Sequence, residues 1–372
     1  MLFRSTVILQ GPAELQLISR MEAYCARGKL RATVPHQAEG FRIGSPKLDL
    51  VDRGTEFGLQ VEDKTEVHVF QGKVELYAPG SDRKETPRKE LTTGQGVRLD
   101  GPGDVRPIEL NPAAFQTAQQ LADRSREETR LRQENWLKAS ADLRKDPSLL
   151  VYYSFQTEQA WGRTVLDQAR DRKQPHDGAI VGCSWATGRW PSKQGLEFKR
   201  VSDRVRFHVP GEFDVLTLMA WVRVDALPNL NNSLMMSDGW QEGGLHWQIG
   251  EAGKIILGVK APGTTPNAHY RTAGVFSQER LGRWSHLAVV YDREAGRVTH
   301  YVDGQLVKEE PVLLDVPVRI GDAELGNWNA ALFRSAQPIR HLSGCMDEFM
   351  LFTRALSGAE IERLYEQGRP PS

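Results

Sequence analysis

Val51-Asp-Arg-Gly-Thr-Glu-Phe-Gly58 and, close behind it, Thr65-Glu-Val-His-Val-Phe-Gln-Gly-Lys-Val-Glu-Leu76 decide the fold of the first part of this chain. Apolar and polar residues alternate along the second segment, which is the period of a half-buried β-strand. Gly72 falls where the chain must turn between two such strands. The apolar positions are Val67, Val69, Val74 and Leu76. The stretch predicts packed strands and contains no recognisable catalytic arrangement.

Outward from this stretch, residues 5–108 contain many short strand patterns separated by turn residues. None of them has helical periodicity of useful length. His68 alternates with the buried valines in the company of Glu66, so we predict that it lies on the surface. Residues 78–90 combine Pro, Gly and mixed charges and predict an exposed loop.

Composition changes over residues 113–146, which are rich in Gln, Arg, Glu, Leu and Ala and contain no Gly or Pro. This composition predicts a helix that begins at Asn111-Pro112 and ends at Asp146-Pro147. Its apolar stripe is incomplete, which favours a helix packed on a neighbour over a coiled-coil dimer.

From Ser148 onward, strand patterns return. Leu216–Val224 alternates cleanly, with Leu216 beginning the predicted core face and Thr217 the opposite face. Asp303-Gly304 lies between two strand patterns and predicts a hairpin. Strands of this length, apolar on at least one face, predict two sheets packed together.

Size and charge restrict the classes of function. The chain has 372 residues, enough for two domains, and its 48 basic and 48 acidic residues balance. We therefore expect no nucleic-acid partner and no attraction to an anionic membrane. No apolar run approaches the roughly 20 residues of a membrane-spanning helix, and the N-terminal apolar segment is too short for a signal peptide.

The cysteines point to no metal or redox motif. Cys25, Cys183 and Cys345 are widely spaced, and no C-x-x-C occurs. A Cys183–Cys345 disulfide would require an oxidising compartment. Buried free thiols are the favoured interpretation.

The stretch from Val51 to Leu76 resembles the FecR-type domain, an extracytoplasmic module of bacterial sigma-factor regulators. The family pattern is a D-x-G-T-E-F motif followed by T-x-V-x-V-x-x-G-x-V, and Leu91–Arg98 resembles its closing L-x-x-G-Q strand. The resemblance implies a β-solenoid or otherwise β-rich domain. It also implies a cytoplasmic segment and a membrane helix before Met1, through which a sigma-factor or transducer system would be reached.

The second half is similar to laminin-G-like domains of the concanavalin A type. The clearest match is Gly344–Leu356 with its continuation Ser357–Tyr365, which follows the pattern G-x-M-D-E-F, R-A-L-S, E-I-x-x-L-Y. Ser357 and Glu360 also form a capping-box pattern for a short helix. We therefore predict an all-β protein with a FecR-like domain over 1–110, a helical connector over 111–147 and a jelly-roll sandwich over 148–372.

Enzymatic chemistry finds little support. A retaining glycosidase needs two carboxylates about 5–5.5 Å apart, and the nearest pattern, Glu212-Phe-Asp214, has Thr217 in place of a third acid. Solvated acids at a turn are the favoured interpretation. No hydrolase, zinc-protease or phosphate-binding motif occurs.

The laminin-G-like resemblance implies a calcium site. Asp347 matches the aspartate of the closing motif, and Asp167 follows the first strand of the domain. These two acids are the candidate ligands for a structural Ca²⁺. The alternative is that Asp347 bonds to backbone in a crowded corner, and the sequence around Asp167 lacks a Gly/Asn-rich calcium loop.

A glycan or protein ligand would need exposed aromatic side chains with a few polar groups. Trp240 and Trp328 stand in polar, glycine-flanked loops, and Trp247 lies in Leu245-His-Trp-Gln248. His246, which sits in an apparent strand as His286 and His300 do, completes the candidate ligand-binding set. The alternative is that these tryptophans pack in the core.

The two resemblances imply a non-enzymatic periplasmic or cell-surface sensor with a glycan- or protein-binding domain. Ligand recognition would pass through the connector as a reorientation of domains. The alternative is a carbohydrate-binding adhesion protein without a signalling role, and a glycoside hydrolase is disfavoured.

Overall fold

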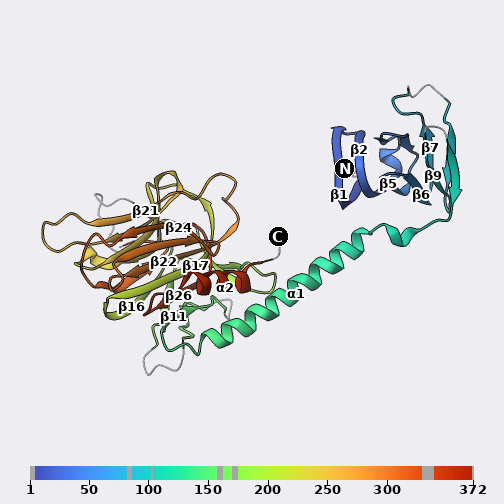
Figure 1. Ribbon diagram of the computed structural model, residues 1–372. Coiled ribbons are helices and arrows are strands. Elements are labelled where there is room, and N and C mark those ends of the chain that lie inside the picture. The colour runs from blue at the N-terminus through green and yellow to red at the C-terminus, as the bar shows by residue number, and fades with distance from the viewer. Residues whose placement is uncertain are drawn as a thin grey trace. The chain divides into compact units, whose positions relative to one another are not determined.

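The computed structural model describes residues 5–81, 86–101, 104–156, 162–169, 175–328 and 339–370 (Figure 1). The chain divides into two compact units, Met1–Glu127 and Glu128–Ser372. The expected predominance of β structure is confirmed. Among the described residues, no helix has both the length and the apolar character needed to cross a membrane.

One mixed sheet makes up the first unit. Its strands are β1 Thr6–Ser19, β2 Glu22–Thr33, β3 Arg42–Gly44, β4 Asp49–Asp52, β5 Glu56–Val61, β6 Thr65–Gln71, β7 Lys73–Tyr77, β8 Lys89–Thr92, β9 Gly96–Leu99 and β10 Val105–Ile108. Their order is β10-β9-β6-β5-β2-β3-β4-β7-β8, with β1 also paired to β2. The β2–β3 pair is parallel and the other pairs are antiparallel. This pairing differs from the stacked parallel coils of a β-solenoid.

The opening motif spans β4 to β7, of which β5 and β6 lie on one side of β2 in the strand order and β4 and β7 on the other. Its four alternating apolar residues are all buried, as predicted. Gly72 has a φ of +85°, and a Cβ there would lie 2.5 Å from the carbonyl oxygen of Gly54. Only glycine therefore suits this turn.

The prediction that His68 lies on the surface is wrong. Only 2% of this residue is exposed. The ring of Phe115, which follows the short helix η2 Pro112–Ala114, lies 5.2 Å from the His68 ring, and the backbone N–H of Asn111 donates to Nδ1 over 3.4 Å. The segment that follows β10 thus covers the outward face of β6. Alternation along β6 alone cannot predict that a distant segment buries this face.

A long helix, α1 Ala118–Leu143, lies within the stretch predicted to be helical. It begins later than predicted because Asn111-Pro112 starts the turn η2 instead. The boundary between the two units falls within α1, and its buried residues, Trp136 and Ser140, belong to the second unit. The role of the helix as a connector stays a prediction.

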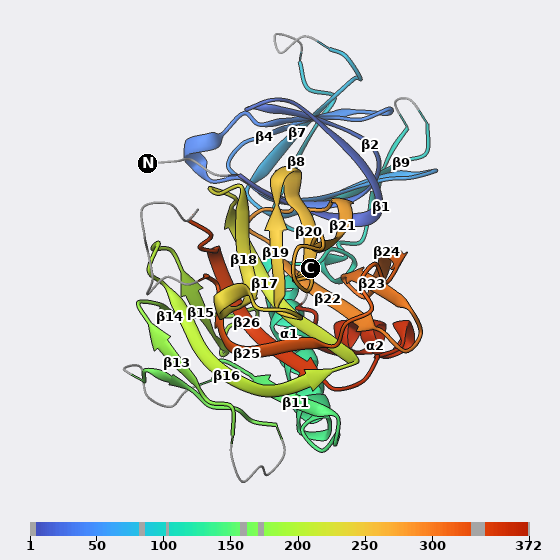
Figure 2. The ribbon, with the colours of Figure 1, turned by 90° about the vertical axis from the view of Figure 1, so that its left-hand side faces the viewer.

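Two sheets form the sandwich of the second unit (Figure 2). The first has the order β14-β15-β26-β17-β22-β23-β24, with β11 also paired to β26, and the second has the order β12-β13-β16-β25-β18-β19-β20-β21. The strands are β11 Leu149–Tyr153, β12 Thr164–Val165, β13 Gly178–Val181, β14 Ser184–Thr187, β15 Gln194–Phe198, β16 Arg204–Phe213, β17 Val215–Ala226, β18 Asn231–Ser237, β19 Leu245–Gly250, β20 Lys254–Val259, β21 Ala268–Gly274, β22 Trp284–Asp292, β23 Arg297–Val302, β24 Gln305–Pro311, β25 Val318–Leu325 and β26 Ser343–Phe352. The short helices η3 Asp238–Trp240 and η4 Glu251–Gly253 lie between strands, and α2 Gly358–Gly368 follows the last strand.

Alternation positions the core of the sandwich. The predicted inward residues of β17 all belong to the cluster between the sheets, and its outward residues Met219 and Trp221 are buried on the opposite side. Asp303 and Gly304 turn between β23 and β24 with φ of +50° and +78°, as a two-residue hairpin requires. Ser357 and Glu360 form the predicted capping box of α2.

Candidate functional site

The candidate ligand-binding residues meet on the outer face of the second sheet. Pairing across four neighbouring strands places Met236, His246, Gly258 and His269 in one row. Their sequence neighbours on β19, Leu245 and Trp247, point into the core, so His246 faces outward. The loops before β19 and after β25 bring tryptophans to this row.

Trp240 lies flat over His246. The two ring centroids are 3.7 Å apart and the planes differ by 28°. Trp240 has a φ of +46° and follows Gly239 with a φ of +72°, so a tight left-handed turn turns the indole back toward the sheet. The indole also packs over Gly258, where a Cβ would lie 3.4 Å from the Trp240 ring, an ordinary contact distance.

Trp328 approaches the same imidazole from its edge. Its ring centroid lies 5.0 Å from that of His246 at 69°, and its Nε1–H donates to the carbonyl oxygen of Ser237 over 3.2 Å. Both Trp240 and Trp328 are half-buried. The structure therefore brings Trp240, His246 and Trp328 together as one aromatic cluster.

His246 is a neutral part of this cluster. Burial, and secondarily the charge of Arg340, lowers its pKa to about 3. Its Nε2 lies 3.3 Å from the carbonyl oxygen of Ser237, which can only accept, so Nε2 carries the proton. The imidazole supports the indoles and adds no charge near neutral pH.

Arg340 completes the site, and sequence reasoning missed it. Its guanidinium carbon lies 4.5 Å from the Trp328 ring centroid, and Nη1 donates to Oε1 of Gln248 over 3.3 Å. The residue is held there because its carbonyl oxygen accepts the backbone N–H of Ser233 on β18. No motif marks Arg340, since its place depends on this long-range pairing.

Trp247 takes no part in the site. Although we expected it among the ligand-binding residues, its exposure is 0% and it lies in the core between the sheets. The reason is the period of the strand: Trp247 is one residue from His246 and so points to the opposite face of β19.

The two predicted calcium ligands are engaged elsewhere. Asp167 accepts backbone N–H groups from Tyr152 and Ala169 at Oδ1, both over 3.0 Å, and from His176 at Oδ2 over 3.1 Å. Asp347 accepts from the backbone N–H and the guanidinium of Arg189.

Lys193 is the second cation that occupies Asp347, with Nζ 2.5 Å from Oδ1. Two fully buried cations neutralise this carboxylate, so Asp347 has no capacity left for a divalent ion. Within the described ranges, His, Cys, Asp and Glu nowhere form a group of three that could hold a metal. The expected pairing of Asp167 with Asp347 around calcium therefore finds no support in their contacts.

Arg189, Lys193, Asp347 and Glu348 form a buried ionic network on the outer face of the first sheet. Arg189 bonds both acids, and Trp136 of α1 donates its indole N–H to Glu348 over 3.0 Å. Burial alone would raise the pKa of Glu348, but the two cations hold it below its ordinary value. This arrangement is structural, because the network is closed off from solvent.

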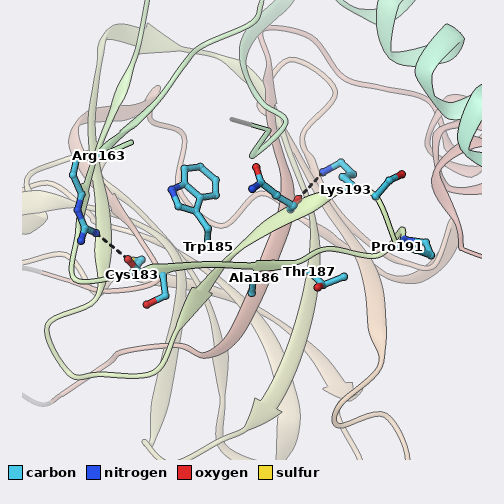
Figure 3. A pocket seen from close by; sticks show the side chains of 10 residues that line it. Arg163, Cys183, Trp185, Ala186, Thr187, Pro191 and Lys193 are labelled. Carbon is cyan, nitrogen blue, oxygen red and sulfur yellow. Dashed lines mark hydrogen bonds between the residues drawn. The ribbon is translucent and has the colours of Figure 1, made fainter. Parts of the chain in front are cut away.

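A hollow away from the aromatic cluster lies beside the edge strand β14 and has a volume of about 630 Å³ (Figure 3). In Figure 3, Arg163 lies at one end and Pro191 at the other, with Trp185 between them. Arg163 donates to the carbonyl oxygen of Cys183 over 3.1 Å, and Trp185 donates its indole N–H to that of Gly162, also over 3.1 Å. The hollow presents one indole and so offers less aromatic surface than the cluster on the second sheet.

The remaining candidates are accounted for by local contacts. Glu212 pairs with Arg319, and Asp214 pairs with Arg293. The three cysteines are buried free thiols.

Comparison with protein families supports two domains. Residues 14–75 match the FecR protein family, and residues 201–362 match the concanavalin A-like lectin/glucanases superfamily. The chain carries a FecR domain followed by a concanavalin A-like domain. The aromatic cluster lies within the second of these matches, and the opening motif lies largely within the first.

Comparison with solved structures finds matches to part of the chain at low identity. The receptor-binding domain of botulinum neurotoxin type G is 13% identical with a TM-score of 0.43, and 59% of this chain covers 51% of that one. The binding domain of Paraclostridial Mosquitocidal Protein 1 is 13% identical with a TM-score of 0.46, covering 59% of this chain and 52% of its own. Domain 4 of the arabinanase AbnA from Geobacillus stearothermophilus, solved with arabinotriose, is 18% identical with a TM-score of 0.44, covering 59% of this chain and 98% of its own.

The chain thus spans about half the length of the two toxin binding domains. No curated protein matches it.

Proposed function

We propose that this chain is a non-enzymatic extracytoplasmic sensor or regulatory protein whose concanavalin A-like domain binds a glycan. The ligand-binding surface is the aromatic cluster of Trp240, His246 and Trp328 with Arg340 at its side. The single observation that carries this proposal is that two indoles gather, half-exposed, on one outer face of the sandwich.

These two indoles are more exposed than three of the other tryptophans. Trp190, Trp221 and Trp247 have exposures of 0%, 2% and 0%, and so serve packing. Trp240 and Trp328 are supported from below by a neutral imidazole, which holds them as a fixed apolar surface. A sugar ring presents C–H groups to such a surface and hydroxyls to nearby polar groups, which is the usual composition of a ligand site.

Two acids of the neighbouring strand β25 are engaged with basic side chains, which favours binding without catalysis. Glu324 is 1% exposed and lies 3.2 Å from Nε of Arg204, and Asp322 lies 2.8 Å from Nδ1 of His208. A glycosidase needs one carboxyl group that can donate a proton and a second that can attack or activate water. Acids that are buried in ion pairs or bonded to histidine are poorly suited to those roles.

The test is binding of purified protein to a glycan array, followed by titration calorimetry with the strongest binder. Trp328→Ala should weaken binding by about 10- to 100-fold, since stacking on an aromatic ring contributes about 1–3 kcal/mol. Trp185→Ala is the matched control, because it removes another half-buried indole from the same domain and should leave affinity unchanged. Equal losses in the two variants, or a folded wild type that binds no glycan, would overturn the proposal.

Enzymatic turnover is tested separately. Incubation with polysaccharides and an assay for new reducing ends should give no signal. A signal that survives purification would move the proposal to a glycoside hydrolase.

The FecR domain supports the regulatory part of the proposal, together with a periplasmic or cell-surface location. The alternative is an adhesion protein with no signalling role. The genomic sequence upstream of Met1 separates the two: a membrane helix and cytoplasmic segment in frame, beside a sigma-factor gene, would support regulation. A reporter of that sigma factor should then respond to the glycan and fail to respond with Trp328→Ala.

A further inference from the structure

Arg340 is a half-buried cation for which the described part of the chain shows no carboxylate partner. Its Nη1 reaches only the neutral amide oxygen of Gln248, over 3.3 Å. Its Nε is buried and has no hydrogen-bond partner there. Burial lowers the pKa of Arg340, and no neighbouring acid opposes that shift.

Two acids on this side of the sandwich are directed to other cations. Glu324 faces Arg204 and Arg206, at 3.2 and 4.0 Å, and Asp238 faces Arg206 at 3.9 Å. Residues 329–338, which precede Arg340 in the sequence, contain no Asp or Glu. Among the described residues, no carboxylate is therefore paired with the charge of Arg340.

The surrounding groups add direction and little competing charge. His246 is neutral near pH 7, and the pKa of His269 is lowered by burial and then by Arg271 and Arg340. The guanidinium carbon lies 4.5 Å from the Trp328 ring centroid. The N–H donors of a guanidinium lie in one plane, where they match the two oxygens of an acidic group.

We propose that the site binds an anionic glycan, whose acidic group pairs with Arg340 while a sugar ring lies on Trp328 and Trp240. The acidic group is a carboxylate or a sulfate ester, since both offer coplanar oxygens at the spacing of a guanidinium. This proposal rests on the glycan-binding function proposed above and names the class of glycan. Burial strengthens the pairing, because the cation has already lost much of its water.

The test compares acidic oligosaccharides with their own neutral counterparts. The panel contains hexuronate, sialylated and sulfated oligosaccharides, each with its carboxyl-reduced or desulfated form. We expect at least one acidic member to bind the full chain about 10- to 100-fold more tightly than its neutral form, as for hydrogen bonds to a charged group. Carboxylate and sulfate arms then show which acid is preferred.

Variants assign the preference to Arg340. Arg340→Gln should remove the gap between acidic and neutral forms, and Arg340→Lys should retain part of it because charge remains without the planar fork. Arg271→Gln, an exposed arginine on the same face, is the matched control and should keep the gap. The wild-type comparison stands by itself if Arg340→Gln does not fold.

The outcomes separate this proposal from the one on which it rests. Equal affinity for acidic and neutral forms, with binding still dependent on Trp328, overturns the anionic preference and leaves glycan binding intact. A gap that persists in Arg340→Gln overturns the assignment to this residue. Binding to no member of either set overturns both proposals.

Discussion

The two outer faces of the sandwich each place an arginine on a tryptophan, and they use it differently. On the first sheet, the Arg189 guanidinium carbon lies 4.7 Å from the Trp221 ring centroid. On the second sheet, the Arg340 guanidinium carbon lies 4.5 Å from that of Trp328. The two distances are nearly the same, so closeness to an indole cannot by itself distinguish a structural arginine from a binding one.

The two arginines differ in the number of carboxylates that they contact. Arg189 bonds Asp347 and Glu348 and donates Nε–H to the carbonyl oxygen of Gly368 over 2.8 Å. Arg340 has an amide oxygen alone among the described acceptors. A buried cation paired with two carboxylates stabilises one fold, whereas a cation with no carboxylate partner among the described residues is available to an external anion. The counter-ions, more than the aromatic neighbours, therefore separate the two faces, and the face without a described counter-ion is the one that we propose binds a ligand.

The largest expected effect comes from removing the paired arginine on the outer face of the first sheet. Arg189→Met should lower the free energy of unfolding of the second unit by about 3–5 kcal/mol, because it leaves two buried acids short of positive charge. Denaturant unfolding followed by tryptophan fluorescence measures this loss. All nine tryptophans lie beyond residue 128, so the signal reports the second unit.

Arg340→Met is the control for that experiment. It strands no carboxylate, so we expect a change of about 1 kcal/mol or less. Losses of similar size in the two variants would contradict the distinction between the faces.

The next largest effect is a loss of stability at acid pH, which compares the two outer faces through their buried histidines. The pKa of His246 in the folded chain is about 3, below the usual value of 6.5, because of burial. As the pH falls below about 6.5, this histidine becomes protonated in the unfolded chain but stays neutral in the folded chain. The free energy of unfolding therefore falls until the pH nears 3. One such histidine contributes a slope of about 1.4 kcal/mol per pH unit.

His246→Gln should remove that slope from unfolding free energies measured between pH 6 and pH 4. His286, on the other outer face, has a pKa also lowered to about 3 by burial, so the same substitution there should remove a slope of equal size. An unchanged pH dependence in His246→Gln would show that the imidazole is hydrated in solution and that the indoles do not cover it.

The smallest expected loss of stability concerns α1, which contacts the ionic network on the outer face of the first sheet. Trp136→Phe keeps an aromatic ring beside Arg189 and removes the N–H that donates to Glu348. Glu348 still accepts from Arg189 and Tyr152, so the loss of stability should be about 1 kcal/mol. Leu137→Ala, at a neighbouring exposed position of α1, should change stability by less than that. A larger loss for Leu137→Ala would contradict the anchoring of α1 through Trp136.

Much of the fold could be predicted from local patterns. Alternation in β17 and β6 identified core positions, and Asp303-Gly304 and the capping box of Ser357 fixed a hairpin and a helix start. These features succeed because each depends on the conformation of a few adjacent residues. The start of α1 was misplaced for the same reason, since Asn111-Pro112 is an equally good signal for the short turn that forms there.

The candidate site could be predicted only in part. Trp240 and Trp328 were found because loop tryptophans flanked by glycine are unusual, and His246 because it shares the motif of β19. Trp247 was included wrongly because the motif does not say which of two adjacent residues faces outward. Which residues of β19 face the core is fixed only when the two sheets pack together.

The sequence by itself determined the two β domains, their turns and the residues that could form a core, because burial follows a short period along the chain. Only the tertiary structure decided that Asp347 faces two buried cations instead of calcium and that His68 lies beneath Phe115. It also placed Arg340, which comes from a loop paired to a distant strand, against Trp328 with no carboxylate partner among the described residues. The physical reason is that charge pairing depends on distances between segments far apart in the chain, and residue spacing does not encode those distances.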